Sequence, residues 1–117
     1  MSTVVADLNC KVIQAGNSAG SIWRLTESED PNANLVRFSV GSGVEEHLND
    51  EVDVVILGVS GEGKVVVEGK VYALSTGTLV FVPKGARRSI LGTSDRFAYL
   101  SIHRKRRGVR IGRRENV

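Results

Sequence analysis

Short apolar runs separated by glycine-rich turns recur along this sequence from residue 10 to residue 103. Val and Ile together number 24, against 16 for Leu and Ala, and β-branched side chains fit pleated strands but lose rotamer freedom in helices. Thirteen glycines punctuate the chain, as turns between many short strands require. No window of about 12 residues holds a 3.6-residue apolar period, so any helix should be short. The pattern predicts an all-β domain.

About nine strands are expected, and their close spacing favours one small barrel or jelly roll. Glu68 and Gly69 lie between two apolar runs and predict a tight hairpin, because Gly supplies the positive φ that such a turn demands. The expected strands cover residues 10–15, 21–25, 35–40, 52–57, 64–67, 71–74, 78–82, 88–91 and 97–103.

Two of these strands carry apolar side chains on both faces, namely residues 52–57, apart from Asp53, and residues 78–82. A strand with one face in water should alternate more cleanly between apolar and polar residues. The outer face is therefore expected to be covered by another sheet, a terminal segment or a second subunit. Because isologous dimers are the commonest oligomers, we expect a homodimer.

Composition and the N-terminal residues exclude several protein classes. No apolar run approaches the roughly 20 residues that a membrane-spanning helix needs, and the N-terminus lacks the basic start and apolar stretch of a signal peptide. Cys10 is the single cysteine, so neither an internal disulfide nor a cysteine-based zinc site can form. A reducing cytoplasm is therefore expected. We interpret Cys10 as a small residue at a strand start, since a reactive thiol would need an activating base.

The charge is unevenly divided along the chain. Residues 1–103 carry 9 Lys+Arg and 12 Asp+Glu, a net −3, whereas residues 104–117 carry 7 Lys+Arg and one Glu, a net +6. We expect residues 1–103 to form one barrel domain and residues 104–117 a basic extension that decorates or clamps the acidic body. The alternative is contact with nucleic-acid phosphates, although no aromatic interleaving or nucleic-acid motif accompanies the run.

A histidine and a glutamate stand at a spacing known from a family motif. His47 is followed by Glu51 after three intervening residues, and Glu51 by Gly58 after six. This resembles the first motif of the cupin superfamily, G-x5-H-x-H, three or four residues, Glu, six residues, Gly. Glu45 occupies the position of the first histidine.

A second run matches the other cupin motif, G-x5-P-x-G-x2-H-x3-N. Gly77, Pro83 and Gly85 stand at its glycine, proline and second glycine, but Arg88 replaces the histidine and Gly92 the asparagine. The two motifs together cover about half of the chain. The resemblance implies a double-stranded β-helix, the jelly-roll barrel of cupins.

In metal-dependent cupins the four motif positions converge on a metal inside the barrel, and here they carry Glu45, His47, Glu51 and Arg88. Arg88 has no lone pair to give and a fixed charge that repels a divalent cation. We favour a metal-free interior in which Arg88 neutralises the carboxylates. The alternative is Mn, Fe, Zn or Ni on the other three side chains. If the strand register were shifted by one residue, Arg87 would face inward in place of Arg88, which would invert the argument about Arg88.

Further side chains are candidates for the barrel interior. Alternation along its strand would turn Asp53 inward, the alternative being a solvated strand-end residue. His103 is interpreted as a solvated strand-end residue, although alternation along the last strand could turn it toward the barrel mouth. Trp23, Tyr72 and Tyr99 are interpreted as core residues rather than as ligand contacts.

The expected function is that of a small cytoplasmic cupin that binds a small polar or anionic ligand through Glu45, His47, Glu51, Asp53 and Arg88. It would act as a binding or sensing module or as a metal-independent enzyme. One alternative is a metal-dependent cupin enzyme, such as a sugar isomerase or a dioxygenase-like protein. The other is a ligand-sensing regulator whose basic tail contacts nucleic acid.

Overall fold

The structure of the protein, a computed structural model, describes residues 3–105 and forms two antiparallel sheets with one helix, α1 (Leu8–Ala15). The five-stranded sheet has the order β1-β2-β9-β4-β7, and the four-stranded sheet the order β3-β8-β5-β6. The strands are β1 (Gly20–Arg24), β2 (Pro31–Phe38), β3 (Gly43–Leu48), β4 (Val54–Ser60), β5 (Glu62–Val67), β6 (Lys70–Ser75), β7 (Leu79–Val82), β8 (Arg87–Gly92) and β9 (Phe97–Arg104).

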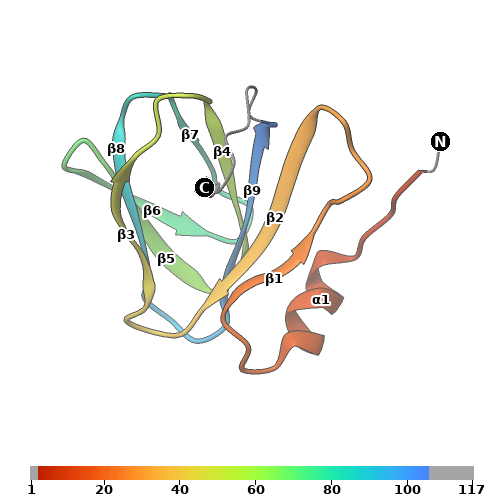
Figure 1. The fold of residues 1–117 in the computed structure, drawn as a ribbon. Coiled ribbons are helices and arrows are strands. Elements are labelled where there is room, and N and C mark those ends of the chain that lie inside the picture. The colour runs from red at the N-terminus through yellow and green to blue at the C-terminus, as the bar shows by residue number, and fades with distance from the viewer. Residues whose placement is uncertain (1–2, 106–117) are drawn as a thin grey trace.

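The two sheets face each other and enclose a common interior, while α1 lies outside the barrel beside β1 and β2 (Figure 1). This arrangement confirms the predicted all-β jelly-roll barrel. Neighbours in each sheet are mostly far apart in sequence, as in the β2–β9 pair, where Pro31 lies opposite Arg104 and Phe38 opposite Phe97.

Eight of the expected strands are present, and the tight hairpin is confirmed. Val67 and Lys70 pair across a two-residue turn in which Glu68 has φ 49° and Gly69 φ 78°, the backbone that a twisted hairpin favours. Strand β2 begins earlier than expected, at Pro31. Its first buried residue is Asn32, and a polar side chain does not indicate the buried face of a strand.

The strand predicted over residues 10–15 is wrong, because this segment belongs to helix α1. The Asp7 side chain caps the helix N-terminus by accepting a hydrogen bond from the Cys10 backbone N–H at 3.1 Å. Gly16, with φ 59°, ends the helix and donates its N–H to the Ile13 carbonyl. Val12 packs on Leu35 of the sheet, so capping and packing override the strand preference of Val and Ile.

Strand β3 was not predicted, because its residues do not alternate regularly. Val44 pairs with Ile90 and His47 with Arg88, so three steps along β3 match only two along β8. This is a β-bulge, in which one residue too many is accommodated on one strand. The irregularity falls at Glu45 and Glu46. Two adjacent glutamates are not typical of a strand, so the sequence pattern did not indicate one here.

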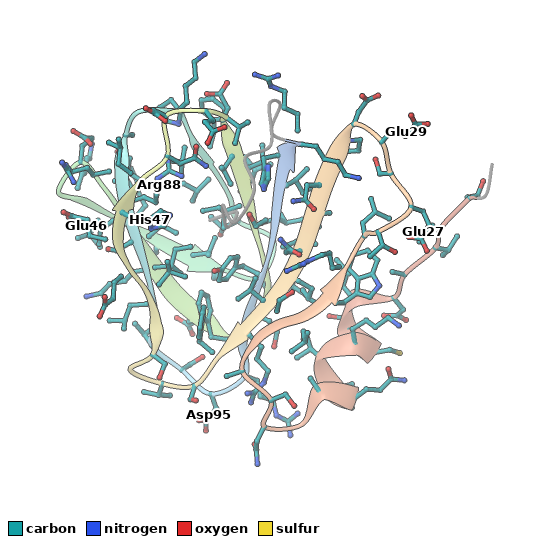
Figure 2. The ribbon with its side chains drawn as sticks, in the orientation of Figure 1. Glu27, Glu29, Glu46, His47, Arg88 and Asp95 are labelled. Atoms are coloured by element: carbon teal, nitrogen blue, oxygen red, sulfur yellow. The ribbon has the colours of Figure 1, made fainter. Side chains whose placement is uncertain are left out.

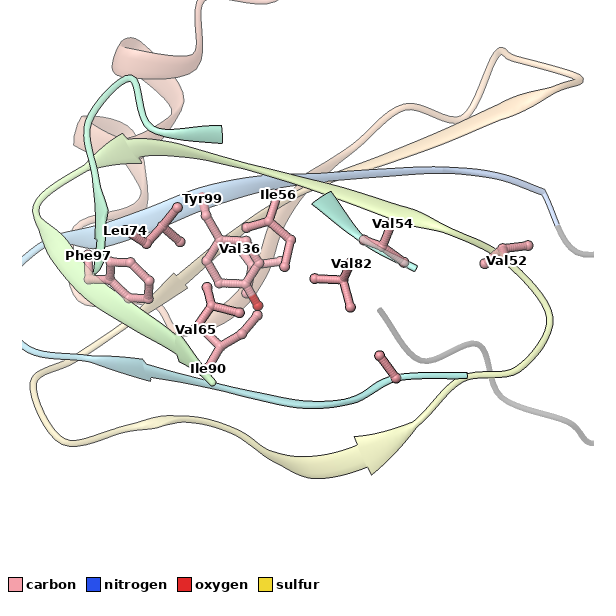
Figure 3. Close-up of a cluster of buried hydrophobic side chains, with 11 residues drawn as sticks. Val36, Val52, Val54, Ile56, Val65, Leu74, Val82, Ile90, Phe97 and Tyr99 are labelled. Carbon is pink, nitrogen blue, oxygen red and sulfur yellow. The ribbon is translucent and has the colours of Figure 1, made fainter. Parts of the chain in front are cut away.

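The core lies between the two sheets (Figure 3). It is built from alternate residues of strands in both sheets, and the side chains of Phe97, Tyr99 and Val65 are fully buried. Its buried members are Val36, Val52, Val54, Ile56, Val65, Leu74, Val82, Ala86, Ile90, Phe97 and Tyr99.

Helix α1 covers only part of the outer face of the five-stranded sheet. Under the helix, Leu35 and Ala98 are fully buried. Away from it, Leu79 and Phe81 on the edge strand β7 are more than half exposed. The outer face therefore remains apolar where the helix does not reach. Among the described residues, no helix is long and apolar enough to cross a membrane.

Candidate functional site

His47 and Arg88 are direct partners in the β3–β8 ladder. Side chains opposite each other in an antiparallel pair lie on the same face, with Cβ atoms roughly 5 Å apart. Arg88 is 2% exposed and the His47 Nε2 atom is buried, so this shared face is the barrel interior. Figure 2 shows the two residues side by side on the β3–β8 side of the barrel.

Backbone carbonyls of the preceding turn hold the Arg88 guanidinium. Its Nε donates to the Ala86 carbonyl at 2.9 Å and its Nη2 to the Pro83 carbonyl at 3.2 Å. Arg87, by contrast, is exposed, and its backbone N–H donates to the Glu68 carboxylate at 2.5 Å. Arg88 is therefore the inward residue of the two.

The β3 bulge turns Glu45 away from the interior. Its side chain is exposed and lines a shallow groove on the outer face of the four-stranded sheet, together with Lys64, Val66 and Ser89. Only its backbone carbonyl reaches His47, whose Nδ1–H donates to it at 3.0 Å. The inward orientation predicted for Glu45 is not what the structure shows, because the bulge breaks the two-residue period that the prediction assumed.

Asp53 also lies outside the barrel, so its predicted inward orientation is wrong. It is exposed, and its Oδ1 accepts a hydrogen bond from the Lys84 backbone N–H at 2.8 Å. Its neighbours Val52 and Val54 face the core instead, with exposures of 2% and 1%. Asp53 thus fastens the turn before β8 rather than lining the interior.

Glu51 stands in the segment between β3 and β4 and is half-buried. Asn49 organises this segment, because its Oδ1 accepts hydrogen bonds from the backbone N–H groups of Glu51 at 2.9 Å and Val52 at 3.4 Å. The Asn49 carbonyl also accepts from the Gly85 N–H at 2.7 Å. These bonds place the Glu51 segment beside the turn that holds Arg88, at the same end of the barrel.

Strand β9 contributes a row of buried side chains to the interior, which changes from the core residues Phe97 and Tyr99 to the polar residues Ser101 and His103. Its inward residues are Phe97, Tyr99, Ser101 and His103, all buried. His103 is 3% exposed, so its interpretation as a solvated strand-end residue is wrong, and the inward position that alternation along β9 allowed is the one observed. Its Nδ1–H donates to the Arg104 carbonyl at 2.8 Å, and its Nε2 can then accept from the Asn32 amide at 3.4 Å.

Three buried polar atoms in the interior have no hydrogen-bond partner among residues 3–105: His47 Nε2, Tyr99 Oη and Ser101 Oγ. Figure 3 shows the Tyr99 hydroxyl pointing across the interior toward Val65 and Ile90. Burial raises the pKa of Tyr99, so the hydroxyl keeps its proton. Buried polar atoms are nearly always partnered. The interior therefore offers hydrogen bonds that its own walls do not use.

The motif positions do not suit a metal ion. Among residues 3–105, no three or more His, Cys, Asp or Glu side chains come together in a way that could hold one. The third histidine position carries the buried guanidinium of Arg88, which cannot ligate and repels a cation. The bulge directs the Glu45 carboxylate to the outer face. Of the usual four ligands, only His47 and Glu51 remain.

Cys10 is exposed on α1, not at a strand start as predicted. Its side-chain interaction with Asp7 raises the pKa of the thiol, so the nucleophilic thiolate is disfavoured. Tyr99 is a core residue as predicted, and Trp23 packs beneath α1. Tyr72 differs, since it is 40% exposed and lies under the Lys70 ammonium at 5.5 Å from its ring centre.

The comparison with protein families agrees with the fold and the motif frame. The cupin domain family matches residues 34–103, more than half of the chain. The chain belongs to the cupin superfamily. No curated protein sequence matches it at a significant level.

Several solved structures share the fold. KdgF from Halomonas sp. is 21% identical with a TM-score of 0.68, over 74% of this chain and 78% of that one. The TT1209 protein from Thermus thermophilus is 21% identical with a TM-score of 0.68, over 87% and 97%. A Bacillus halodurans protein is 13% identical with a TM-score of 0.75, over 92% and 85%. At these identities the likeness concerns the fold alone.

The sequence did not single out Ser101, Asn32 or Asn34 for the site. These residues are identified only by the pairing of β2 with β9, which places Asn32 opposite His103 and Asn34 opposite Ser101 on the inward face. This pairing joins segments about seventy residues apart. The basic tail predicted over residues 104–117 lies, from residue 106 onward, outside the described residues.

Proposed function

We propose that this cupin binds a small anionic ligand at the polar end of its barrel, without the metal ion of many relatives. Cupins as a superfamily often bind small ligands, and three of the four motif positions, His47, Glu51 and Arg88, lie at one end of this barrel. The observation that carries the proposal is the buried Arg88 opposite His47. A guanidinium in a low-dielectric interior attracts an anion much more strongly than it would in water.

Arg88 fills the role that a metal ion plays elsewhere, because both present positive charge to an anionic ligand. Its position does not depend on ligand, since the Ala86 and Pro83 carbonyls already hold it. Glu51 contributes a carboxylate at the same end of the barrel, and His47 an imidazole nitrogen. Glu45 and Asp53 are left out of the proposed site because both lie on the outside.

Charge-matched probes test this proposal. Gluconate and sorbitol have the same six-carbon, hydroxylated chain, but only gluconate carries a carboxylate. We expect gluconate to bind at least about tenfold more tightly by calorimetry, which corresponds to about 1.4 kcal/mol. Arg88→Met should abolish the difference, whereas Arg87→Met should keep it. Equal binding of both probes would contradict the proposal. Arg88→Lys retains the charge and should keep a preference for gluconate, so a loss of the preference in this variant would also contradict the proposal if Arg88→Met does not fold.

The metal-dependent alternative makes the opposite prediction. A barrel that binds Mn, Fe, Zn or Ni through His47 and Glu51 would gain stability from the ion, because a ligand that binds the native state raises its melting temperature. We expect no such rise with Mn²⁺, Ni²⁺ or Zn²⁺ in excess. Stoichiometric metal in protein purified from metal-supplemented cells would favour the metal enzyme instead.

The homodimer is part of the same proposal. The exposed Leu79 and Phe81 continue, through the β4–β7 register, into the half-buried Leu57 and Val55. Such a contiguous apolar area on a sheet face is typical of protein contacts. An isologous dimer would cover it in both subunits at once.

The remaining expectations rest on the sequence. We propose that residues 104–117 form a basic extension of a barrel domain that comprises residues 1–103, and that the extension contacts acidic surface of this protein in preference to nucleic acid. Retention on a heparin or DNA column that disappears on deleting residues 106–117 would favour the nucleic-acid alternative. A single cysteine that is exposed, Cys10, supports a reducing compartment such as the cytoplasm.

A further inference from the structure

Two hydroxyl groups inside the barrel lack a hydrogen-bond partner within the described part of the chain, although their residues are buried. Tyr99 is 0% exposed and Ser101 1% exposed, and neither Tyr99 Oη nor Ser101 Oγ makes a hydrogen bond to any of residues 3–105. Both project inward from β9, as alternate residues of one strand. Leaving a buried hydroxyl unpaired is costly, so these two atoms need an explanation beyond packing.

The walls around the two hydroxyls do not supply partners. Tyr99 packs in a cluster with Val36, Ile56, Val65 and Ile90, which are all apolar. Beside Ser101 stand Ile56 on β4 and Asn34 on β2, and the Asn34 side-chain oxygen already accepts from Arg24 Nε at 2.7 Å. A molecule that enters the interior would be the missing partner.

His47 restricts the chemistry of that molecule. Its Nδ1–H is donated to the Glu45 carbonyl, so in the neutral ring the buried Nε2 is an acceptor. An acceptor needs an O–H or N–H group from the ligand, which a carboxylate does not offer. The Tyr99 and Ser101 hydroxyls can donate or accept. All three atoms therefore suit hydroxyl groups.

From these atoms and the charge of Arg88 we infer that the ligand is a small hydroxy acid, with its carboxylate toward Arg88 and its hydroxyls on Ser101, Tyr99 and His47. This inference rests on the proposed function and adds the hydroxyl groups to it. Tyr99 and Ser101 are alternate residues of β9 and both are buried, so their side chains project to the same face of the sheet, the barrel interior.

Gluconate and hexanoate test the inference, because they share the carboxylate and the chain length but differ in hydroxyl groups. We expect gluconate to bind at least about tenfold more tightly. Ser101→Ala and Tyr99→Phe should each weaken gluconate binding by about tenfold and leave hexanoate binding unchanged. If hexanoate binds as tightly as gluconate, the hydroxyl contacts are overturned while anion binding stands. If neither acid binds, the proposed function itself fails.

The ligand-free protein provides a test that does not depend on the probe. Because unpaired buried hydroxyls destabilise, Tyr99→Phe and Ser101→Ala should each raise the melting temperature of ligand-free protein, by about 4 °C. Tyr72→Phe is the matched control, since Tyr72 is 40% exposed, and should leave the melting temperature unchanged. A lower melting temperature for both interior variants would show that the hydroxyls are satisfied within the protein, by bound water, and would overturn the inference.

Discussion

Arg88 stands directly across the β3–β8 ladder from His47, and both side chains face the barrel interior. The pairing sets a permanent cation beside an imidazole whose Nδ1–H is already donated to the Glu45 carbonyl. An arginine held by main-chain carbonyls cannot leave the site as a metal ion can. The positive charge of this cupin is therefore built into the strand itself.

Arg88 should also be important for stability. Arg88→Ala removes a side chain that is 2% exposed and leaves the Ala86 and Pro83 carbonyls without their guanidinium donors. We expect the free energy of unfolding in urea to fall by about 3 kcal/mol. Arg87→Ala is the control, because an exposed side chain should change it by less than about 0.5 kcal/mol. Equal losses for the two variants would refute the distinction.

Asp53 should matter for the turn before β8 and not for the ligand. Asp53→Ala removes the acceptor for the Lys84 N–H and should lower the unfolding free energy by about 1 kcal/mol. Asp53→Asn keeps an oxygen acceptor and should be nearly neutral. Both variants should bind gluconate as the wild type does in calorimetry. A tenfold weaker Kd for Asp53→Asn would return this residue to the site.

Helix α1 should loosen in acid. The hydrogen bond from the Cys10 backbone N–H holds the pKa of Asp7 below its usual 3.8. A carboxylate with a lowered pKa contributes stability above the unfolded value, and this contribution is lost as pH falls through the lower folded value. NMR shifts of the α1 amides should therefore change between pH 4 and pH 2. In Asp7→Asn, which caps without titrating, the same shifts should stay flat; an unaltered titration would contradict this.

Phe81 should be required for the proposed homodimer. It is 55% exposed on the edge strand β7, so Phe81→Glu should shift the sedimentation coefficient to that of a monomer without unfolding the barrel. Tyr72→Glu, which alters an exposed aromatic residue on the other sheet, should leave the dimer intact. A wild-type protein that sediments as a monomer at micromolar concentration would exclude the homodimer.

Much of the fold was predictable because β-branched residues and glycine turns act locally. The turn at Glu68 and Gly69 needs only its own two residues to form. Helix α1 escaped prediction because its eight residues are too few to show a period, and its caps at Asp7 and Gly16 decide the structure. Strand β3 escaped because its bulge interrupts the alternation that identifies a strand.

The site was predictable only where the motif frame fixes a residue on a regular strand. Arg88 is such a residue, and its inward orientation follows from the period of β8. Glu45 lies beside a bulge, and Asp53 follows a turn. A strict two-residue alternation therefore assigns both side chains to the wrong face. The unpaired hydroxyls of Tyr99 and Ser101 depend on what β2 and β4 set beside them, which no local pattern records.

The bulge in β3 bears on whether substitutions could rebuild the four-ligand metal centre of other cupins. On a regular strand Glu45 would share a face with His47, and Val44 would point to solvent. With the bulge, Val44 packs against the core and Glu45 is exposed. Substituting histidines for Glu45 and Arg88 would therefore not rebuild a four-ligand metal centre. The main chain would first have to slide by one residue and give up the packing of Val44, so the backbone as well as the side chains decides which of these positions faces the interior.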